Sequence, residues 1–512
     1  MSETHRQRID EAQAADASDD LAGVEVIDLQ DAPPLAPAAP LSKGEVRTIL
    51  LSLMLTMFLT ALDQTIVATA LPTIGRQFHD VGNLSWVITA YLLSSTAVAP
   101  VYGTLSDIYG RRAMITVSLA LFLIGSVLCA IAPNILLLIL ARALQGIGGG
   151  GILPLVQTVI SDVVSPRERG QYQAYFSSVW VAAGIGGPIL GGLFAEHLHW
   201  SVIFWINLPL GAWAYLMTRS ALRRLPRHDR PHKLDVLGAL LMVSATVTLM
   251  LALHQGGIDY PWFSPQILGL FAASLVFWTL FAWRIATAGE PLIPLEVLFN
   301  KVVSTATVAA SLGMGTYIGL SIYMPVYFQS VRGLGTSTSG LALIPLMVGT
   351  VVGATIAGQL MGRITHYKRI PVIGLFFAMA GALVLALFDD RLSLFTFELI
   401  LGLISIGLGT VLPTTTVAIQ NAVQFHQLGT ATGAMNFFRQ LGSAILVAVF
   451  GAILMGGNAG GATPENVASS SFVYMFLGSF AGFLIGFIFL LLMKEMPLRS
   501  SARHAAEAIA VD

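Results

Sequence analysis

Three ionisable side chains interrupt runs of apolar residues that are long enough to cross a lipid bilayer: Asp63, Arg142 and Arg439. An ionisable group at the centre of a bilayer costs at least about 2.5 kcal/mol, so each is a candidate functional residue. Asp63 lies about fifteen residues into its run, and Arg142 lies about seven residues into a run of the opposite direction. The two side chains are therefore expected at similar depths.

A carboxylate that pairs with an arginine when ionised, and is released when protonated, can act as a proton switch. We hypothesise that Asp63 carries a proton and that Arg142 controls how readily it does so. The alternative is a static buried ion pair that holds the surrounding helices together.

Arg439 has no acid at its own depth in the second half of the chain, although Asn436 and Gln440 are close enough in sequence to solvate it. Two interpretations stay open. In one, Arg439 lines a cavity and attracts an anionic group, with Asn436 and Gln145 as further polar residues of that cavity. In the other, Arg439 braces the interface between helices.

The composition explains why these charges are exceptional. The chain has 512 residues, of which 55% are hydrophobic and 11% are charged, whereas a soluble protein carries about 25% charged residues. This excludes a nucleic-acid-binding protein, a disordered scaffold and an ordinary cytosolic enzyme. The single cysteine, Cys129, excludes an internal disulfide. The composition indicates an all-α membrane protein that crosses the bilayer many times.

A membrane helix needs about 20 apolar residues. Fourteen candidate spans satisfy this requirement, near residues 48–70, 85–104, 113–132, 135–163, 172–195, 201–220, 236–255, 266–286, 303–328, 337–362, 370–388, 394–421, 428–455 and 472–494. Continuous apolar runs of this length exclude the alternation of a β-barrel.

The positive charges predict the orientation. With a cytoplasmic N-terminus, the inside loops and tails hold 22 of the 27 Lys and Arg residues, six of them in Arg219–Lys233. This bias places both termini in the cytoplasm. Residues 1–47 carry ten acids and four bases without an apolar core for a signal peptide, so they are expected to form a disordered tail.

The short inside loop between the second and third spans, Gly103–Arg112, reads GTLSDIYGRR. It resembles the signature loop of the major facilitator superfamily. Five further segments resemble motifs of the drug-exporting branch of that family. Ala61–Pro72 resembles its first-helix motif, Arg142–Gly146 its buried-arginine motif and Gly184–Gly192 its antiporter motif. Trp205–Pro209 and Gly429–Gly442 are also similar to sequences of that branch. Together they cover most of residues 50–455. A degraded second loop, with Gly358, Arg363, Lys368 and Arg369, has Gly362 where the first has Asp107.

The resemblance implies a major facilitator fold of the fourteen-span drug:proton antiporter family, with two six-helix bundles and an inserted helix pair. The expected divisions are an acidic tail (1–47), an N-terminal bundle (48–220), a basic loop with the inserted pair (221–302), a C-terminal bundle (303–494) and a cytoplasmic tail (495–512). The binding site is expected near the bilayer midplane between the two bundles.

The resemblance also assigns roles to residues outside the buried charges. A cytoplasmic gate would use salt bridges among Asp107, Arg111 and Asp162, with Gly103 and Gly110 permitting a tight turn, unless the three charged residues form only a solvated ion cluster. In the fifth span, the glycines permit close helix packing and the proline permits a kink, and the resemblance implies that this helix prevents leakage through the closed transporter. The alternative is that the glycines only pack helices, as in other membrane proteins. The residues are Gly184, Gly187, Pro188, Gly191 and Gly192.

Several other patterns carry no functional prediction. The glycines of Gly146–Gly151 match a dinucleotide-binding motif only on paper, because they lie in an apolar span and not after a strand, so close helix packing is expected. No P-loop sequence is present, and the HxH pair His197 and His199 has no further ligands beside it, so neither ATP nor a metal is expected. No cofactor is expected, and no nucleophile–base arrangement suggests an enzyme.

The leading interpretation is a multi-pass transporter of the cell membrane that exports lipophilic small molecules in exchange for protons by alternating access, and that works as a monomer. A second interpretation is a proton-coupled exporter of one narrow physiological substrate, such as a metabolite or an anionic siderophore. A membrane receptor or scaffold that does not transport is the third, against which the costly buried charges argue.

Overall fold

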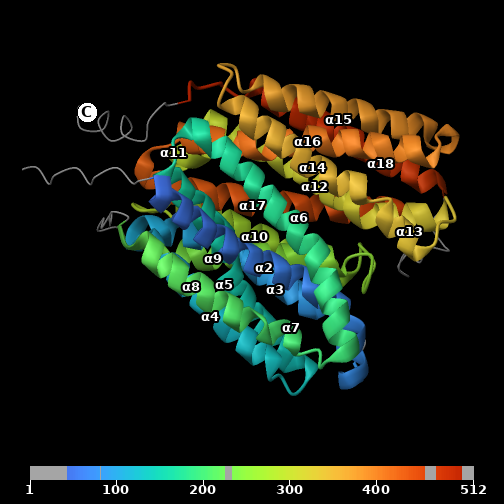
Figure 1. The fold of residues 1–512 in the computed structure, drawn as a ribbon, viewed down its shortest axis with the longest axis horizontal. Coiled ribbons are helices and arrows are strands. Elements are labelled where there is room, and N and C mark those ends of the chain that lie inside the picture. Colours follow the sequence, from blue (N-terminus) through green and yellow to red (C-terminus); the bar gives the residue numbers. More distant parts are fainter. Residues whose placement is uncertain (1–42, 81, 225–232, 456–468, 499–512) are drawn as a thin grey trace, which may run out of the picture. The chain divides into compact units, whose positions relative to one another are not determined.

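The computed structural model describes residues 43–80, 82–224, 233–455 and 469–498, and all long elements within them are α-helices (Figure 1). The first half consists of α2 (Lys43–Phe78), α3 (Leu84–Tyr109), α4 (Arg111–Ala130), α5 (Ile135–Val163), α6 (Pro166–His197), α7 (Val202–Trp205) and α8 (Asn207–Ala221). The middle of the chain forms α9 (Val236–Gln255), α10 (Pro265–Thr287) and the short α11 (Leu295–Leu298). The second half consists of α12 (Lys301–Ser330), α13 (Thr336–Leu341), α14 (Ile344–Met361), α15 (Arg369–Phe388), α16 (Leu394–Ala422), α17 (Leu428–Met455) and α18 (Ser469–Leu492).

Thirteen helices of the described residues are long and apolar enough to cross a membrane. The sixth predicted span, 201–220, is divided into α7 and α8, and α8 has only 15 residues. The reason lies in Pro209, which has no N–H to donate to the carbonyl of Trp205. Ile206 between the two helices keeps helical dihedral angles (φ −62°, ψ −26°). The predicted count of fourteen spans is therefore not confirmed by helix length.

The predicted span ends differ from the structure at several places. The helix α2 begins at Lys43 and not at residue 48, and α6 begins at Pro166 and not at residue 172. Most of the predicted N-terminal tail, the centre of the basic loop (225–232) and most of the C-terminal tail lie outside the described residues.

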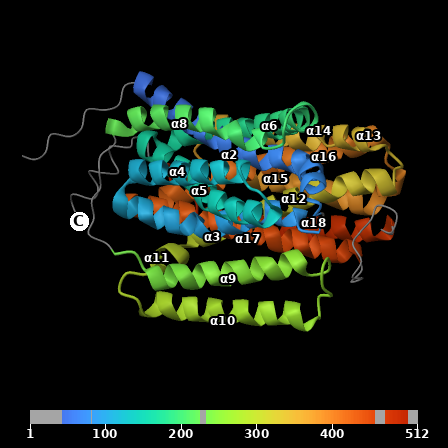
Figure 2. The ribbon, with the colours of Figure 1, turned by 90° about the horizontal axis from the view of Figure 1, so that it is seen from below.

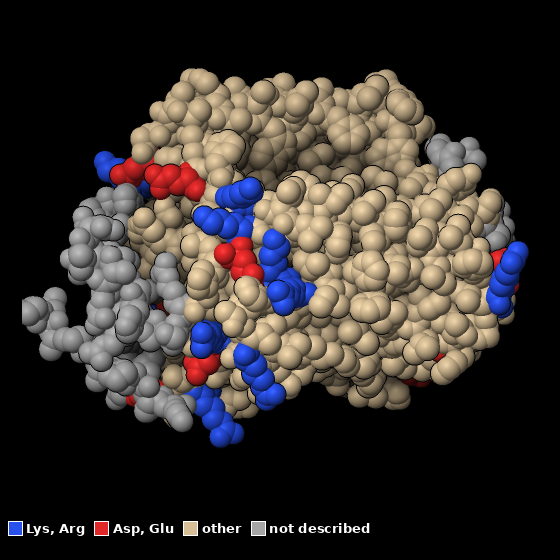
Figure 3. Space-filling model, turned by 90° about the horizontal axis from the view of Figure 1, so that it is seen from above, with Lys and Arg blue, Asp and Glu red and all other residues tan. Residues whose placement is uncertain are grey.

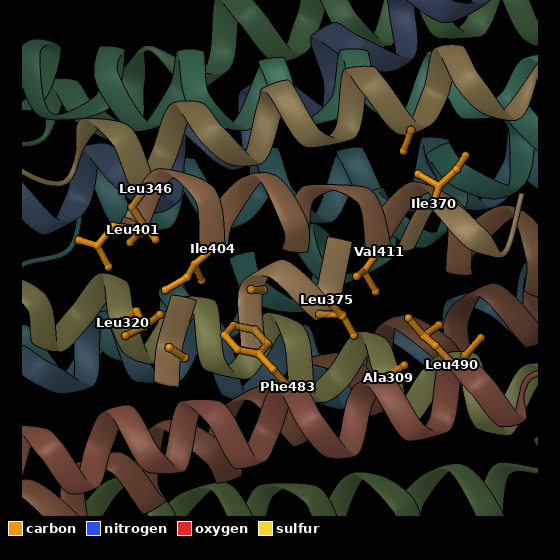
Figure 4. Packing of buried hydrophobic residues seen from close by; sticks show 14 of the residues in the cluster. Ala309, Leu320, Leu346, Ile370, Leu375, Leu401, Ile404, Val411, Phe483 and Leu490 are labelled. Carbon is orange, nitrogen blue, oxygen red and sulfur yellow. The ribbon is translucent and has the colours of Figure 1, made fainter. Parts of the chain in front are cut away.

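The two halves of the chain pack by the same rule. Within the first half α2 packs on α6 and α3 packs on α5, while within the second half α14 packs on α16 and α12 packs on α17. The halves are joined chiefly by α3 with α17 and by α6 with α14, and α5 also contacts α17 and α6 also contacts α16. In the second half, a core of aliphatic and aromatic side chains fills the space between the helices (Figure 4).

The helices α9 and α10 lie side by side as a separate layer (Figure 2). Within the pair, the Ser274 hydroxyl donates to the carbonyl of Ala245 at 2.9 Å, and Arg284 pairs with Asp235 at 3.0 Å. The pair meets the rest of the protein mainly through α9, which contacts α3 and α17, and the ring of Trp278 on α10 also lies 6.1 Å from that of Phe437 on α17. It occupies the place in the chain where the inserted pair was predicted.

The glycines of Gly146–Gly151 pack helices closely, as the sequence predicted. A Cβ atom at Gly148 would overlap the backbone of Phe122 in α4, and one at Gly150 would overlap the backbone of Ser95 in α3. Absence of side chains lets α5 lie directly against both neighbours.

The surface is consistent with a membrane environment. Large apolar side chains are exposed on the helices, for example Leu275, Phe395 and Leu216. Figure 3 shows a broad uncharged band with charged residues gathered toward one end and a smaller group at the opposite edge. Such a band is expected for helices that lie in hydrocarbon.

Candidate functional site

Asp63 and Arg142, which the sequence predicted at similar depths, form a buried ion pair. The Nη1 atom of Arg142 on α5 lies 2.6 Å from the Oδ2 atom of Asp63 on α2. Both side chains are almost fully buried, at 2% and 0% exposure. Packing of α2 against α5 brings the two residues together, although 79 positions separate them in the sequence.

Two amides complete the surroundings of the carboxylate. Gln145 on α5 and Asn207 on α8 donate from their side-chain nitrogens to Oδ1 of Asp63, at 2.9 and 2.8 Å. Gln145 also accepts from Arg142 at 2.6 Å and donates to the Ser126 hydroxyl at 2.7 Å. The Asp63 network therefore comprises Asp63, Arg142, Gln145, Asn207 and Ser126, from four helices. The carboxylate of Asp63 accepts hydrogen bonds from Arg142, Gln145 and Asn207.

The guanidinium of Arg142 is held on its other sides as well. Its Nε atom donates to the carbonyl of Val87 at 3.1 Å. Its carbon Cζ lies 4.3 Å from the ring centroid of Tyr91, in cation–π contact. The charge of Arg142 is thus matched by one carboxylate, its Nε and Nη1 atoms have hydrogen-bond acceptors, and an aromatic ring lies against the guanidinium.

The sequence reasoning missed part of this network. Asn207 belongs to the matched motif Trp205–Pro209, and an amide inside an apolar run is itself a signal of a buried polar contact. Ser126, Val87 and Tyr91 carry no such signal, since a serine, a backbone carbonyl and an aromatic ring are common in membrane helices. Only the packing of the helices shows that they surround Arg142.

The predicted gate residues come together at the end of α3. Arg111 pairs with Asp107 and, through its Nε atom, with Oδ2 of Asp162 at 3.1 Å. Gly110 between α3 and α4 has φ 86°, a left-handed conformation that favours glycine. We call this end of the helices, where α3 ends and α4 begins, the Asp107 end.

Asp107 also contacts the second half of the protein. Its carboxylate accepts from the backbone nitrogens of Gly429 at 3.0 Å and Thr430 at 2.7 Å, and from the Thr430 hydroxyl at 2.8 Å. These groups form the N-terminus of α17, where unpaired N–H groups and the helix dipole favour an anion. The sequence did not predict this contact, because Gly429 and Thr430 lie more than 300 positions away.

Close approach of α3 to α17 makes the contact possible. A Cβ atom at Gly103 would overlap the backbone of Gly429. In the other pair of helices that joins the halves, Gly358 of α14 lies against Gly170 of α6 in the same manner. The two loops differ chemically, because Gly362 in the second loop has no carboxylate to offer α6.

The five predicted residues of the fifth span face different neighbours. Cβ atoms at Gly187 and Gly191 would overlap Thr65 and Thr69 of α2, so these two glycines allow α6 to lie close to the helix of Asp63. Gly184 faces Met347 of α14, Gly192 faces open space and Pro188 lies within α6. The Thr65 hydroxyl donates to the carbonyl of Ala183 at 2.8 Å and links α2 to α6.

Arg439 and Asn436 are adjacent on α17, as predicted, while Gln145 lies in the Asp63 network and not beside them. Arg439 donates from Nη2 to the Oδ1 atom of Asn436. The Asn436 amide donates in turn to Oε1 of Gln157 on α5 at 2.7 Å. Gln440 does not solvate Arg439; it accepts from the Thr96 hydroxyl at 3.0 Å.

A cavity of about 390 Å³ lies between α11, α12 and α17. Its lining is mostly apolar and includes Val303, Met435, Phe438 and Ile445, with the hydroxyls of Thr307 and Ser311. An apolar space with few polar groups is suited to a lipophilic compound or an acyl chain.

The described residues contain no group of three or more His, Cys, Asp or Glu side chains that could hold a metal ion. His197 is the last residue of α6, and His199 follows it. Nδ1 of His199 lies 2.9 Å from the Ser201 hydroxyl, within hydrogen-bonding distance.

Comparison with known proteins identifies the family. The profile of the Major Facilitator Superfamily matches residues 53–447. The multidrug transporter protein MdtP of Bacillus subtilis is 34% identical over 416 residues, which cover 80% of this chain and 76% of that protein. Multidrug resistance protein 3 of the same organism is 34% identical over 413 residues, or 80% of each chain. An uncharacterized transporter of Mycobacterium tuberculosis, Rv1877, is 31% identical over 502 residues, 91% of this chain and 73% of that one.

Solved structures agree on the fold. The proton:xylose symporter XylE has a TM-score of 0.62 at 13% identity, covering 91% of this chain and 99% of that chain. The human organic anion transporter MFSD10 has a TM-score of 0.61 at 18% identity, covering 87% and 99%. At these identities the likeness concerns the fold alone. The chain therefore belongs to the major facilitator superfamily, as a multi-pass membrane protein that resembles multidrug exporters.

Proposed function

We propose that this protein exports lipophilic small molecules in exchange for protons, and that Asp63 carries the proton. The observation that supports this most directly is the sealed pair of Asp63 and Arg142 in the membrane-spanning helices. The names of the relatives, multidrug transporter and multidrug resistance protein, support export of small molecules. The apolar cavity beside α17 supports a lipophilic substrate.

Proton binding to Asp63 would act on the whole network. When ionised, Asp63 balances the charge of Arg142 and accepts three hydrogen bonds. When protonated, it leaves Arg142 without a counter-charge, and an uncompensated buried charge costs about 3–5 kcal/mol. The protonated protein would therefore favour another arrangement of α2, α5 and α8. Substrate binding and proton binding would compete through this rearrangement.

The contact of Asp107 with α17 would serve as the gate. It joins the two halves at the end of α3, and its hydrogen bonds must break if the halves separate there. Alternating access by rocking of the two halves would open and close this end. With the Asp107 end in the cytoplasm, the described arrangement is closed toward the cytoplasm.

The number of spans, the bundle boundaries and the orientation are proposed from the sequence. We propose fourteen spans, with α7 and α8 together as the sixth, bundles at 48–220 and 303–494, and α9 with α10 as the inserted pair. The bias of Lys and Arg supports cytoplasmic termini in the cell membrane. Nothing in the proposal requires a second copy of the chain.

The test uses purified protein in liposomes with an imposed pH gradient. Lipophilic cations, neutral drugs and organic anions are added in turn, and proton movement is recorded for wild type and for Asp63→Asn. We expect some compounds to drive proton movement in wild type and none to do so in Asp63→Asn. Undiminished exchange in that variant would remove Asp63 from the mechanism, and silence of wild type with every compound would favour a narrow-substrate exporter or a receptor.

A matched control distinguishes the role of Asp63 from loss of any buried carboxylate. Asp235 is also buried and paired with an arginine, Arg284, but it lies in the α9–α10 pair. Asp235→Asn should keep proton exchange. If both variants lose it equally, the loss reflects disturbed packing.

A further inference from the structure

The second half of the protein contains a buried positive charge that the proton mechanism does not use. Arg439 lies eleven residues after Leu428, the first residue of α17, about 16 Å along the helix. Its side chain is only 9% exposed. Among the described residues no carboxylate pairs with it, and its one side-chain partner is the neutral amide of Asn436.

Asn436 is fixed in its orientation. Its side-chain nitrogen donates to Oε1 of Gln157 at 2.7 Å and to the carbonyl of Thr432 at 2.8 Å. Its oxygen is therefore directed toward Arg439. The guanidinium has five N–H donors, so most of its hydrogen-bonding capacity is not used by Asn436.

Comparison with Arg142 shows what Arg439 lacks. Arg142 has a carboxylate, a backbone carbonyl, a glutamine and an aromatic ring around it. An arginine keeps its charge in a protein interior, and an uncompensated charge there costs several kcal/mol. Bracing of the two halves does not require this charge, because neutral hydrogen bonds from Asn436 to Gln157 and from Thr96 to Gln440 already join them.

The surroundings of Arg439 are suited to an amphipathic molecule. The cavity of about 390 Å³ lies against the same stretch of α17. Met435 and Gly442 line it, one turn before and one turn after Arg439 on neighbouring positions of the helix surface. Arg439 does not itself line the cavity, and Met435 and Gly442 mark the side of the cavity nearest to it. An amphipathic molecule with its apolar body in the cavity would have to extend its polar end past these two residues to meet the guanidinium.

We propose that Arg439, oriented by Asn436 and Gln157, is an anion-recognition subsite for amphipathic substrates that carry a carboxylate, sulfonate or phosphate group. The planar guanidinium can bind such groups with two parallel hydrogen bonds. The proposal rests on the proposed export function, since the anion is the substrate's own. Organic anions would then be among the transported compounds. Arg142 would control proton binding to Asp63, and Arg439 would bind the anionic group of the substrate.

The experiment measures binding without a proton gradient, so it does not depend on Asp63. The probes are 1-pyrenebutyrate and its uncharged methyl ester, followed by fluorescence polarisation with the purified full chain. We expect wild type to bind the carboxylate more tightly than the ester. Arg439→Gln should weaken carboxylate binding by about tenfold or more, the equivalent of one hydrogen bond to a charged group, and leave ester binding unchanged.

Two further variants keep the test decisive. Arg439→Lys retains the charge without the planar fork, so an intermediate affinity for the carboxylate is expected even if Arg439→Gln does not fold. Arg363→Gln, which removes an exposed arginine of the Asp107 end, should bind both probes as wild type does. Equal binding of both probes to wild type, or an unchanged preference in the Arg439 variants, would overturn the proposal.

The proposed function can fail or hold separately. Arg439→Gln should still exchange protons for neutral and cationic compounds in the liposome assay. If wild type binds 1-pyrenebutyrate through Arg439 but exchanges no protons with any compound, the anion subsite stands and proton-coupled export does not.

Discussion

At the scale of residues, the two buried arginines Arg142 and Arg439 differ in their partners. Arg142 is neutralised by Asp63 and enclosed by partners from α3, α5 and the aromatic ring of Tyr91. Arg439 has a fixed amide beside it and no carboxylate among the described residues. A charge that is paired within the protein suits a switch, and a charge that is not paired suits a ligand.

The ion pair of Asp63 and Arg142 gives a prediction about stability. Arg142→Leu leaves the carboxylate buried without its counter-charge, and we expect it to lower the free energy of unfolding by about 3–5 kcal/mol. The double variant Asp63→Asn with Arg142→Leu removes both charges and should regain most of this loss. Thermal unfolding in detergent measures the stability.

Transport by the same variants decides between a proton carrier and a static pair. For a proton carrier, the double variant should be stable and yet inactive in proton exchange. Recovery of both stability and exchange in the double variant would mean that the pair serves the structure only.

At the scale of elements, one carboxylate at the end of α3 reaches the start of α17. Asp107 caps two backbone nitrogens of α17 and pairs with Arg111, so it connects the loop of the first half to a helix of the second. The corresponding loop after α14 has Gly362 instead. The contact of α3 with α17 and the contact of α6 with α14 are therefore both closely packed, but only the first includes a carboxylate, that of Asp107.

Asp107→Asn should impair the gate and spare the substrate site. Loss of a helix cap costs about 1 kcal/mol, so we expect turnover to fall about fivefold while the dissociation constant of the substrate is unchanged. Transport rates in liposomes and equilibrium binding check the two parts. The exposed Asp390, at the opposite end of the protein, supplies the control Asp390→Asn, which should be normal in both. Weakened binding with normal turnover in Asp107→Asn would contradict a gate.

At the scale of the whole molecule, transport requires movement between the two halves and rigidity within each. Two pairs of threonine hydroxyls allow a direct comparison. Thr104 of α3 and Thr430 of α17 lie 3.4 Å apart across the halves, and Thr56 of α2 and Thr218 of α8 lie 3.4 Å apart within one half.

Cysteine pairs at these positions, in a background of Cys129→Ala, test the rocking motion. Oxidation of Thr104→Cys with Thr430→Cys should stop transport, and reduction should restore it, because the disulfide would hold α3 against α17. Oxidation of Thr56→Cys with Thr218→Cys should cross-link the protein and leave transport intact. Full activity of the first pair in its oxidised form, shown by gel mobility, would exclude opening at the Asp107 end.

The sequence by itself determined the features that depend on local composition. Apolar runs of sufficient length predicted nearly all the long helices, because every backbone polar group in a bilayer must be bonded within its own segment. The loop after α3 predicted a charge cluster of Asp107 and Arg111, and the family resemblance added Asp162 to it. The run lengths predicted similar depths for Asp63 and Arg142, and the family resemblance implied that their two helices belong to one bundle.

Only the tertiary structure decided which partners those residues have. It brought Asn207 of α8 to Asp63, the start of α17 to Asp107, and Gln157 of the first half to Asn436 of the second. The physical reason is common to all of these contacts: they join helices far apart in sequence, and their geometry depends on how closely the small residues of the helices let them pack.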